Sequence, residues 1–125
     1  MVKLTHPYGE LTGGAWLRGN LHTHTTQSDG SRDPQSVIDD YARRGYGFLM
    51  LSDHEVWTSE ETYRRWDPRG LVLVPGNEIG GGPHLLHVDA DRRVAPVPSR
   101  QELLNAIASI ARETGRGFAI VNHPN

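Results

Sequence analysis

The segment "NLHTHTTQSDG", residues 20–30, combines two imidazoles, a carboxylate and four hydroxyl side chains. His22 and His24 stand two residues apart, so on an extended strand their side chains point the same way and can bind one metal centre. Asp29 can return to that centre from the following loop, where Gly30 permits a tight turn. The segment by itself is also compatible with a polar loop, so the metal interpretation depends on the rest of the chain.

The later apolar runs also carry metal-binding residue types near their carboxyl ends. "LMLSDH" contains His54, "LVPGNE" contains Glu78, "IVNHP" contains His123, and "HLLHV" offers His84 or His87. The carboxyl ends of parallel strands lie on one face of a sheet, where active sites are built, so these residues are predicted to converge. His84 is preferred over His87 because it follows a glycine-rich loop.

Imidazole and carboxylate donors without thiolate suit Zn, Mn or Fe(II), and the chain has no cysteine. The groups outnumber the ligands of one tetrahedral ion, which indicates a cluster of two or three divalent ions. Asp53 is a ligand, a carboxylate that orients an imidazole, or a solvated residue at a strand end. Glu78 bridges two ions or is a solvated loop acid.

Short apolar runs alternate with helical patterns, which favours strand–helix units around a mostly parallel sheet. Strands are predicted within residues 15–24, 46–54, 71–78, 84–90 and 118–125. The predicted helices begin at Asp33–Pro34, at a capping box of Thr58 and Glu61, and at a capping box of Ser99 and Glu102. Their predicted ends are Gly45, Asp67–Pro68, and Gly115 or Gly117.

The bulk composition limits the classes of protein and of partner. A chain of 125 residues fits one small domain, and a net charge of -2 offers no basic surface for long nucleic acid. No apolar run approaches the ~20 residues of a membrane span, and the amino terminus lacks a secretory signal pattern. The cytoplasm is therefore the default location. His6 is predicted to lie at the surface, and the oligomeric state is not indicated.

Four motifs together carry a family resemblance. "NLHTHTTQSDG", "LSDHE", "PGNEI" followed by "GPHLL", and "VNHP" occur in the order and approximate spacing of the polymerase and histidinol phosphatase (PHP) superfamily. The chain resembles that superfamily from about Trp16 to Asn125, and "WLRGNLHTHTTQSDG" is similar to its carbaryl hydrolase-like subgroup. The resemblance implies a distorted TIM-like (β/α)7 barrel, here partial with about five strands, and it implies as metal ligands His22, His24, Asp29, His54, Glu78, His84 and His123.

The later Asp-x-His motif of the superfamily does not follow His123 in this chain. A barrel normally takes about 250 residues, so residues 1–125 are predicted to be a PHP-type domain truncated at its carboxyl end. The parent protein is then an enzyme, whereas this chain alone is expected to be inactive or very weak.

The predicted function is metal-dependent hydrolysis of a small-molecule phosphoester, by a phosphatase or phosphodiesterase that uses a metal-bound hydroxide. Asp53 and His54 are the predicted catalytic residues, and either Asp53 or the Asp or His of the later Asp-x-His motif could manage the proton of the leaving group. Two alternatives remain open. The same hydroxide can attack a carbamate, ester or amide carbonyl, and a PHP-type domain can bind metal without catalysis.

Overall fold

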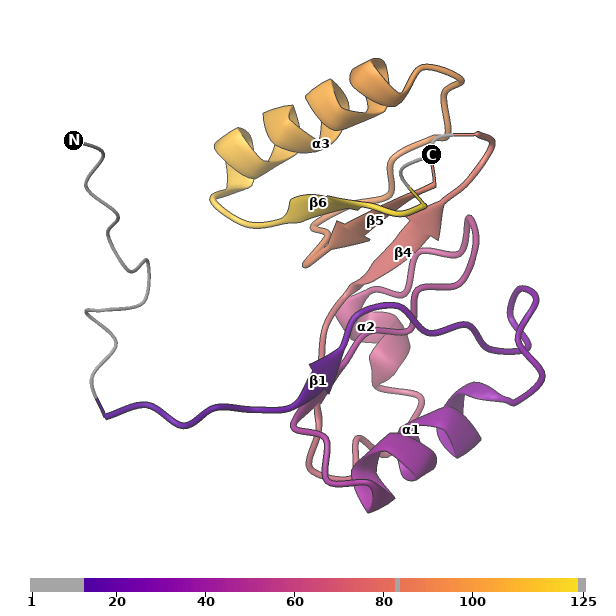
Figure 1. Ribbon diagram of the computed structural model, residues 1–125, viewed down its shortest axis with the longest axis vertical. Coiled ribbons are helices and arrows are strands. Elements are labelled where there is room, and N and C mark those ends of the chain that lie inside the picture. Colours follow the sequence, from indigo (N-terminus) through magenta and orange to yellow (C-terminus); the bar gives the residue numbers. More distant parts are fainter. Residues whose placement is uncertain (1–12, 83, 124–125) are drawn as a thin grey trace.

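The computed structural model describes residues 13–82 and 84–123, so the prediction for His6 lies outside the described residues. The described residues form two three-stranded sheets and three helices (Figure 1). The elements in chain order are β1 (Gly19–Asn20), α1 (Pro34–Arg43), β2 (Phe48–Leu49), α2 (Glu60–Tyr63), β3 (Val72–Leu73), β4 (Gly76–Ile79), β5 (Leu85–Val88), α3 (Arg100–Thr114) and β6 (Phe118–Val121). Among these, no helix has the length and apolar character of a membrane span.

The prediction of a partial, distorted TIM-like (β/α)7 barrel is wrong, because only the first sheet is parallel and no barrel closes in the described residues. The first sheet has the order β1-β2-β3, whereas β4-β5-β6 is antiparallel throughout. Only residues 80–84 separate β4 from β5. A parallel crossover needs a dozen or more residues, so this short connection allows only a hairpin.

The third predicted strand, residues 71–78, is divided between the two sheets at Pro75. β3 pairs with β2 in the first sheet, and β4 pairs with β5 in the second. Proline has no N–H to donate to a ladder, and its carbonyl here accepts from Ala90 N at 3.0 Å. The chain therefore leaves one sheet and enters the other at this residue.

The predicted helices are confirmed, with corrections at their ends. The carboxylate of Asp33 accepts from Ser36 N at 3.0 Å and caps α1, and Gly45 follows α1 at φ 72°. The cap of α2 is Ser59 rather than Thr58, whose backbone instead pairs with Gly76. α2 also ends at Tyr63, before Asp67.

The longest helix, α3, begins and ends where capping signals predict. Ser99 Oγ accepts from Glu102 N at 3.3 Å, and Gly115, not Gly117, closes the helix at φ 73°. Leu103 and Ile107 of α3 are buried against the β4-β5-β6 sheet, which α3 covers in Figure 1. This apolar contact holds α3 on the second sheet and thereby fixes the positions of the ends of β4, β5 and β6.

The core has three apolar clusters, one on each sheet and one between the sheets. Val37 and Ile38 of α1 pack on Leu49 and Leu51, and Met50 packs against Leu86 where the sheets meet. A parallel bridge between His54 and Glu78 also joins the segment after β2 to β4. The polar ends of both sheets are thereby held together.

Candidate metal centre

The carboxylate of Glu78 lies at the centre of a group of histidines. Its Oε2 is 2.9 Å from His22 Nε2 and 2.8 Å from His24 Nε2, and its Oε1 is 3.3 Å from His84 Nδ1. The side chain is only 1% exposed. On the backbone, Glu78 N donates to Ser52 O at 3.1 Å, so the residue is fixed to the segment after β2. A carboxylate buried from water needs hydrogen-bonding or charged partners, and the imidazoles supply them here.

The histidines His22 and His24 follow β1, which ends at Asn20, so the idea that they stand on a regular strand is wrong. They nevertheless converge, with ring centroids 5.1 Å apart. The turn is held by side chains: His22 N donates to Asn20 Oδ1 at 3.1 Å, and Thr23 N donates to Ser52 Oγ at 2.8 Å. Hydrogen bonds rather than strand geometry therefore aim both imidazoles at Glu78.

Asp29 and His54 complete the side of the cluster nearest the first sheet. Asp29 Oδ1 is 2.7 Å from His24 Nδ1, and Asp29 Oδ2 is 3.7 Å from His54 Nε2. The hydrogen bond from His24 is the main reason that the pKa of Asp29 lies below its ordinary value. His54 Nδ1 is also 3.7 Å from Glu78 Oε2, so this imidazole stands between the two carboxylates.

Gly30 is needed for close approach rather than for a positive φ. A Cβ at this position would lie 2.4 Å from the carbonyl oxygen of His24 and 2.7 Å from Thr25 N. Gly30 N also donates to Thr25 O at 2.9 Å, which closes the turn that returns Asp29 to the histidines. The predicted tight turn exists, but its physical reason is steric contact with the backbone.

His84 and His123 approach from the second sheet. Their ring centroids are 6.0 Å apart, and the ring of His123 is 6.1 Å from that of His22. Both have a positive φ, 42° and 46°, as does Glu55 at 60°. A left-handed backbone at non-glycine residues costs on the order of 1–3 kcal/mol each and is concentrated at functional sites. Three of the five non-glycine residues with a positive φ in the described part of the chain therefore lie in or beside the cluster, and the other two, Arg69 and Asp89, lie elsewhere.

All seven predicted ligands lie in this cluster. Two sets of three, His22–Glu78–His123 and His24–His54–Glu78, have donor atoms within 4.8 Å of one another. Both sets share Glu78, whose two oxygens face different imidazoles. Imidazole nitrogen with carboxylate oxygen is a donor set suited to Zn, Mn or Fe, so the residues fit the predicted class of cofactor.

Glu78 is ionised despite its burial. Burial by itself raises the pKa of this carboxyl, but hydrogen bonds from Asn122 and His22 outweigh it and lower the pKa to about 2. Asn122 Nδ2 donates to Glu78 Oε1 at 3.1 Å. The site therefore presents a buried negative charge, the counterpart that a divalent cation requires.

Asp53, predicted to be catalytic, binds the loop that carries Asp29. It is fully buried, and its Oδ1 accepts from Thr25 N and Ser28 Oγ, both at 2.7 Å. Its Oδ2 accepts from Thr25 Oγ1 at 2.9 Å. These bonds engage both oxygens of the carboxylate, so Asp53 positions the loop.

His87 lies on the other face of β5 from the cluster. In the β4–β5 ladder Leu86 pairs with Glu78, and His87 pairs with Asn77. Successive side chains of a strand point to opposite faces, so His87 is directed away from the carboxylate. The structure thus places His84, and not His87, among the cluster residues.

Two contributors were missed in the sequence. Asn122 precedes His123 in "VNHP" and is buried, with its amide on Glu78 and its N donating to His84 O at 2.9 Å. Glu55 follows His54, and its Oε1 accepts from Gly80 N at 2.6 Å, which holds the loop before His84. The only available signal was that each adjoins a predicted ligand.

In comparisons with known proteins, no family model matches the chain, and no match was found among curated proteins. The resemblance to the PHP superfamily therefore stays a prediction from motifs. What the structure adds is the convergence of the residues that those motifs contain.

Proposed function

We propose that this protein binds divalent metal ions at the histidine–glutamate cluster and uses them to hydrolyse a phosphoester of a small molecule. The observation that carries the proposal is the buried carboxylate of Glu78, shared between two sets of imidazoles. Two sets that share one carboxylate support at least two ions, with Zn, Mn and Fe as the candidates. The residues that would hold them are His22, His24, Asp29, His54, Glu78, His84 and His123.

Divalent ions held there would polarise a phosphoryl oxygen and acidify a water molecule. The chain's own residues supply the fixed geometry. Asn122 orients the carboxylate of Glu78, and Asp53 holds the turn that delivers Asp29. His54, half-buried between the two carboxylates, is proposed to bind metal through one ring nitrogen, which leaves the other ring nitrogen for proton transfer.

A charged substrate is favoured over a neutral carbamate or amide. Arg18, Arg32 and Arg44 line a pocket to which His24 also belongs, and arginine is suited to phosphate and carboxylate. The net charge of -2 still supports a small molecule rather than long nucleic acid. The cytoplasm remains the proposed location, since a chain without cysteine is compatible with a reducing compartment.

The test is the hydrolysis of p-nitrophenyl phosphate after rigorous removal of metal and after its restoration. Activity should vanish on removal, return with Mn or Zn, and be lost in Glu78→Gln, which keeps the shape of the side chain without its charge. Glu61→Gln, an exposed glutamate of α2, is the matched control and should retain activity. Because this chain alone is expected to be at most weakly active, the comparison needs only a hydrolysis rate that is measurable above background. Turnover that survives metal removal, or that Glu78→Gln retains, would contradict the proposal.

A second assay distinguishes hydrolysis of a phosphoester from attack on a carbonyl. Incubation with an aryl carbamate and with an aryl phosphate, followed by measurement of free phosphate and free phenol, shows which centre is attacked. The proposal predicts metal-dependent release of phosphate. Metal-dependent release of phenol from the carbamate alone would favour the carbonyl alternative.

A further inference from the structure

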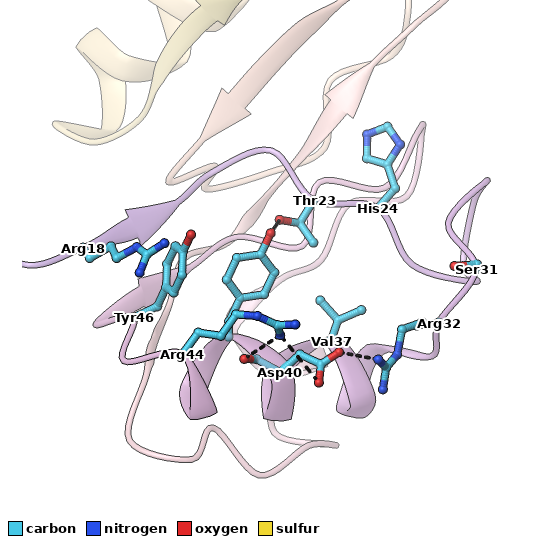
Figure 2. A pocket seen from close by; sticks show the side chains of 10 residues that line it. Arg18, Thr23, His24, Ser31, Arg32, Val37, Asp40, Arg44 and Tyr46 are labelled. Atoms are coloured by element: carbon cyan, nitrogen blue, oxygen red, sulfur yellow. Dashed lines mark hydrogen bonds and ion pairs between the residues drawn. The ribbon is translucent and has the colours of Figure 1, made fainter.

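A pocket of about 480 Å³ lies between the segment around β1 and helix α1 (Figure 2). Arg18 enters it from before β1, Arg32 from the loop before α1, and Arg44 from the end of α1. His24 also lines it, with its ring directed away from α1 in Figure 2 and its Nε2 at 2.8 Å from Glu78 Oε2. The pocket and the cluster are therefore adjacent.

The lining of the pocket carries an excess of positive charge. The lining holds three guanidinium groups and one carboxylate, that of Asp40, which is 2.5 Å from Arg32 Nη1 and 3.7 Å from Arg44 Nη1. Asp40 also pairs with Arg43, outside the pocket. One carboxylate cannot neutralise this many arginines, so the pocket keeps a positive potential that attracts anions.

The guanidinium of Arg18 has N–H donors that are available to a ligand. Its guanidinium carbon lies 4.2 Å above the ring of Tyr46, and within residues 13–82 and 84–123 it forms no ion pair. Tyr46 is itself supported by an edge-to-face contact with Tyr41, with ring centroids 4.7 Å apart. A guanidinium stacked on an aromatic ring keeps its planar fork available for a phosphate or carboxylate.

Tyr41 supplies a neutral donor to the same space. Its hydroxyl oxygen accepts from Asn20 Nδ2 at 2.5 Å and from Thr23 Oγ1 at 3.3 Å. A hydroxyl that accepts twice still has its own proton to donate, so an acceptor in the pocket can complete the network.

We propose that this pocket binds an anionic group, a phosphate or a carboxylate, on the non-reacting part of the substrate. The inference rests on the proposed function, and it narrows the substrate to a small phosphoester that carries a second anionic group. Arg18 is the main contact, Arg32 and Arg44 supply charge, and Tyr46 positions Arg18.

The direct test is calorimetric titration of metal-free protein with inorganic phosphate at about pH 8, where imidazoles in general are uncharged. Arg18→Met keeps the apolar stem and removes the charge, and it should weaken binding about tenfold or more, the loss expected for charge-assisted hydrogen bonds. Tyr46→Leu should weaken it less, and Tyr46→Phe should not change it. Arg93→Met, at an exposed arginine far along the chain, is the matched control. Equal affinity in Arg18→Met and Arg93→Met would overturn the assignment.

A second arm ties the pocket to the substrate. In metal-loaded protein, Arg18→Met should raise KM for 4-carboxyphenyl phosphate more than for phenyl phosphate, which has no second anion. An unchanged KM ratio would overturn the role of the pocket in substrate binding. If neither ester is hydrolysed although Arg18→Met loses phosphate affinity, the proposed reaction fails while the anion site stands, so the two failures are distinguishable.

Discussion

The parallel and antiparallel halves of the molecule meet at one cluster of side chains but reach it by different routes. The parallel half, β1-β2-β3 with α1, presents His22, His24 and His54 from turns beyond short strands. The antiparallel half, β4-β5-β6 with α3, presents Glu78 from within a buried strand. A shared site thus does not require one parallel sheet, because the bridge between His54 and Glu78 joins the two sheets at their polar ends.

Both halves contain buried polar groups, some with hydrogen-bond partners and some without. In the parallel half both carboxylate oxygens of Asp53 accept hydrogen bonds. Buried polar atoms with no hydrogen-bond partner among the described residues occur in both halves: Gln27 Nε2, Trp57 Nε1 and Thr58 Oγ1 in segments that follow β1 and β2, and Asn77 Oδ1 and both ring nitrogens of His87 in β4 and β5. Both halves therefore depend on apolar packing and contain unpartnered polar groups, and Asp53 is a fully paired carboxylate in the first.

The largest effects are expected from cavities in the two apolar cores. Ile38→Ala in α1 and Ile107→Ala in α3 each remove a buried side chain and should each cost about 2–5 kcal/mol of unfolding free energy. Both should shift a single denaturant transition, because the halves share the cluster between the sheets. Two separate transitions, each moved by only one variant, would show that the halves fold independently.

Asp53→Ala should cost about 3 kcal/mol, because it leaves the buried donors of Thr25 without an acceptor. It should also weaken metal binding through the loop that carries Asp29. Asp91→Ala, at an exposed aspartate, is the control and should change stability by less than about 0.5 kcal/mol. Equal stability of the two variants in urea would contradict the positioning role of Asp53.

Gly30→Ala tests the turn that returns Asp29. The added Cβ would meet the backbone of His24 and Thr25, so the turn must open, at a cost of about 2 kcal/mol. Gly14→Ala adds a Cβ with no atom within 4 Å and should be neutral. Thermal unfolding measures both, and a neutral Gly30→Ala would show that the turn is not constrained.

The smallest effect, on the antiparallel half, depends on pH. Burial lowers the pKa of His87 from its ordinary value of 6.5, more than Asp89 raises it, so the folded state keeps the imidazole neutral. The unfolded chain binds a proton first as the pH falls, so this contribution to stability is present above about pH 6.5 and is lost below it. Between about pH 8 and pH 5, His87→Leu should lose less unfolding free energy than the native chain. Parallel pH profiles would contradict this prediction.

The parts that could be predicted are those set by local chemistry. Asp33, Ser99 and Gly115 mark helix ends because their capping groups act within a few residues. The antiparallel sheet was missed because apolar runs do not report strand direction. The connection over residues 80–84 is too short for a parallel crossover and could have indicated a hairpin. Asn122 was missed because its role depends on a contact with Glu78, 44 residues away in the sequence.

The most direct test of the shared centre is its metal content, measured by elemental analysis after equilibrium dialysis against Mn or Zn. The native chain should bind at least two ions, and His22→Ala in the parallel half and His123→Ala in the antiparallel half should each lower the stoichiometry or the affinity. His87→Leu should retain native binding. Native stoichiometry and affinity in both His22→Ala and His123→Ala would contradict a metal centre built from the two halves.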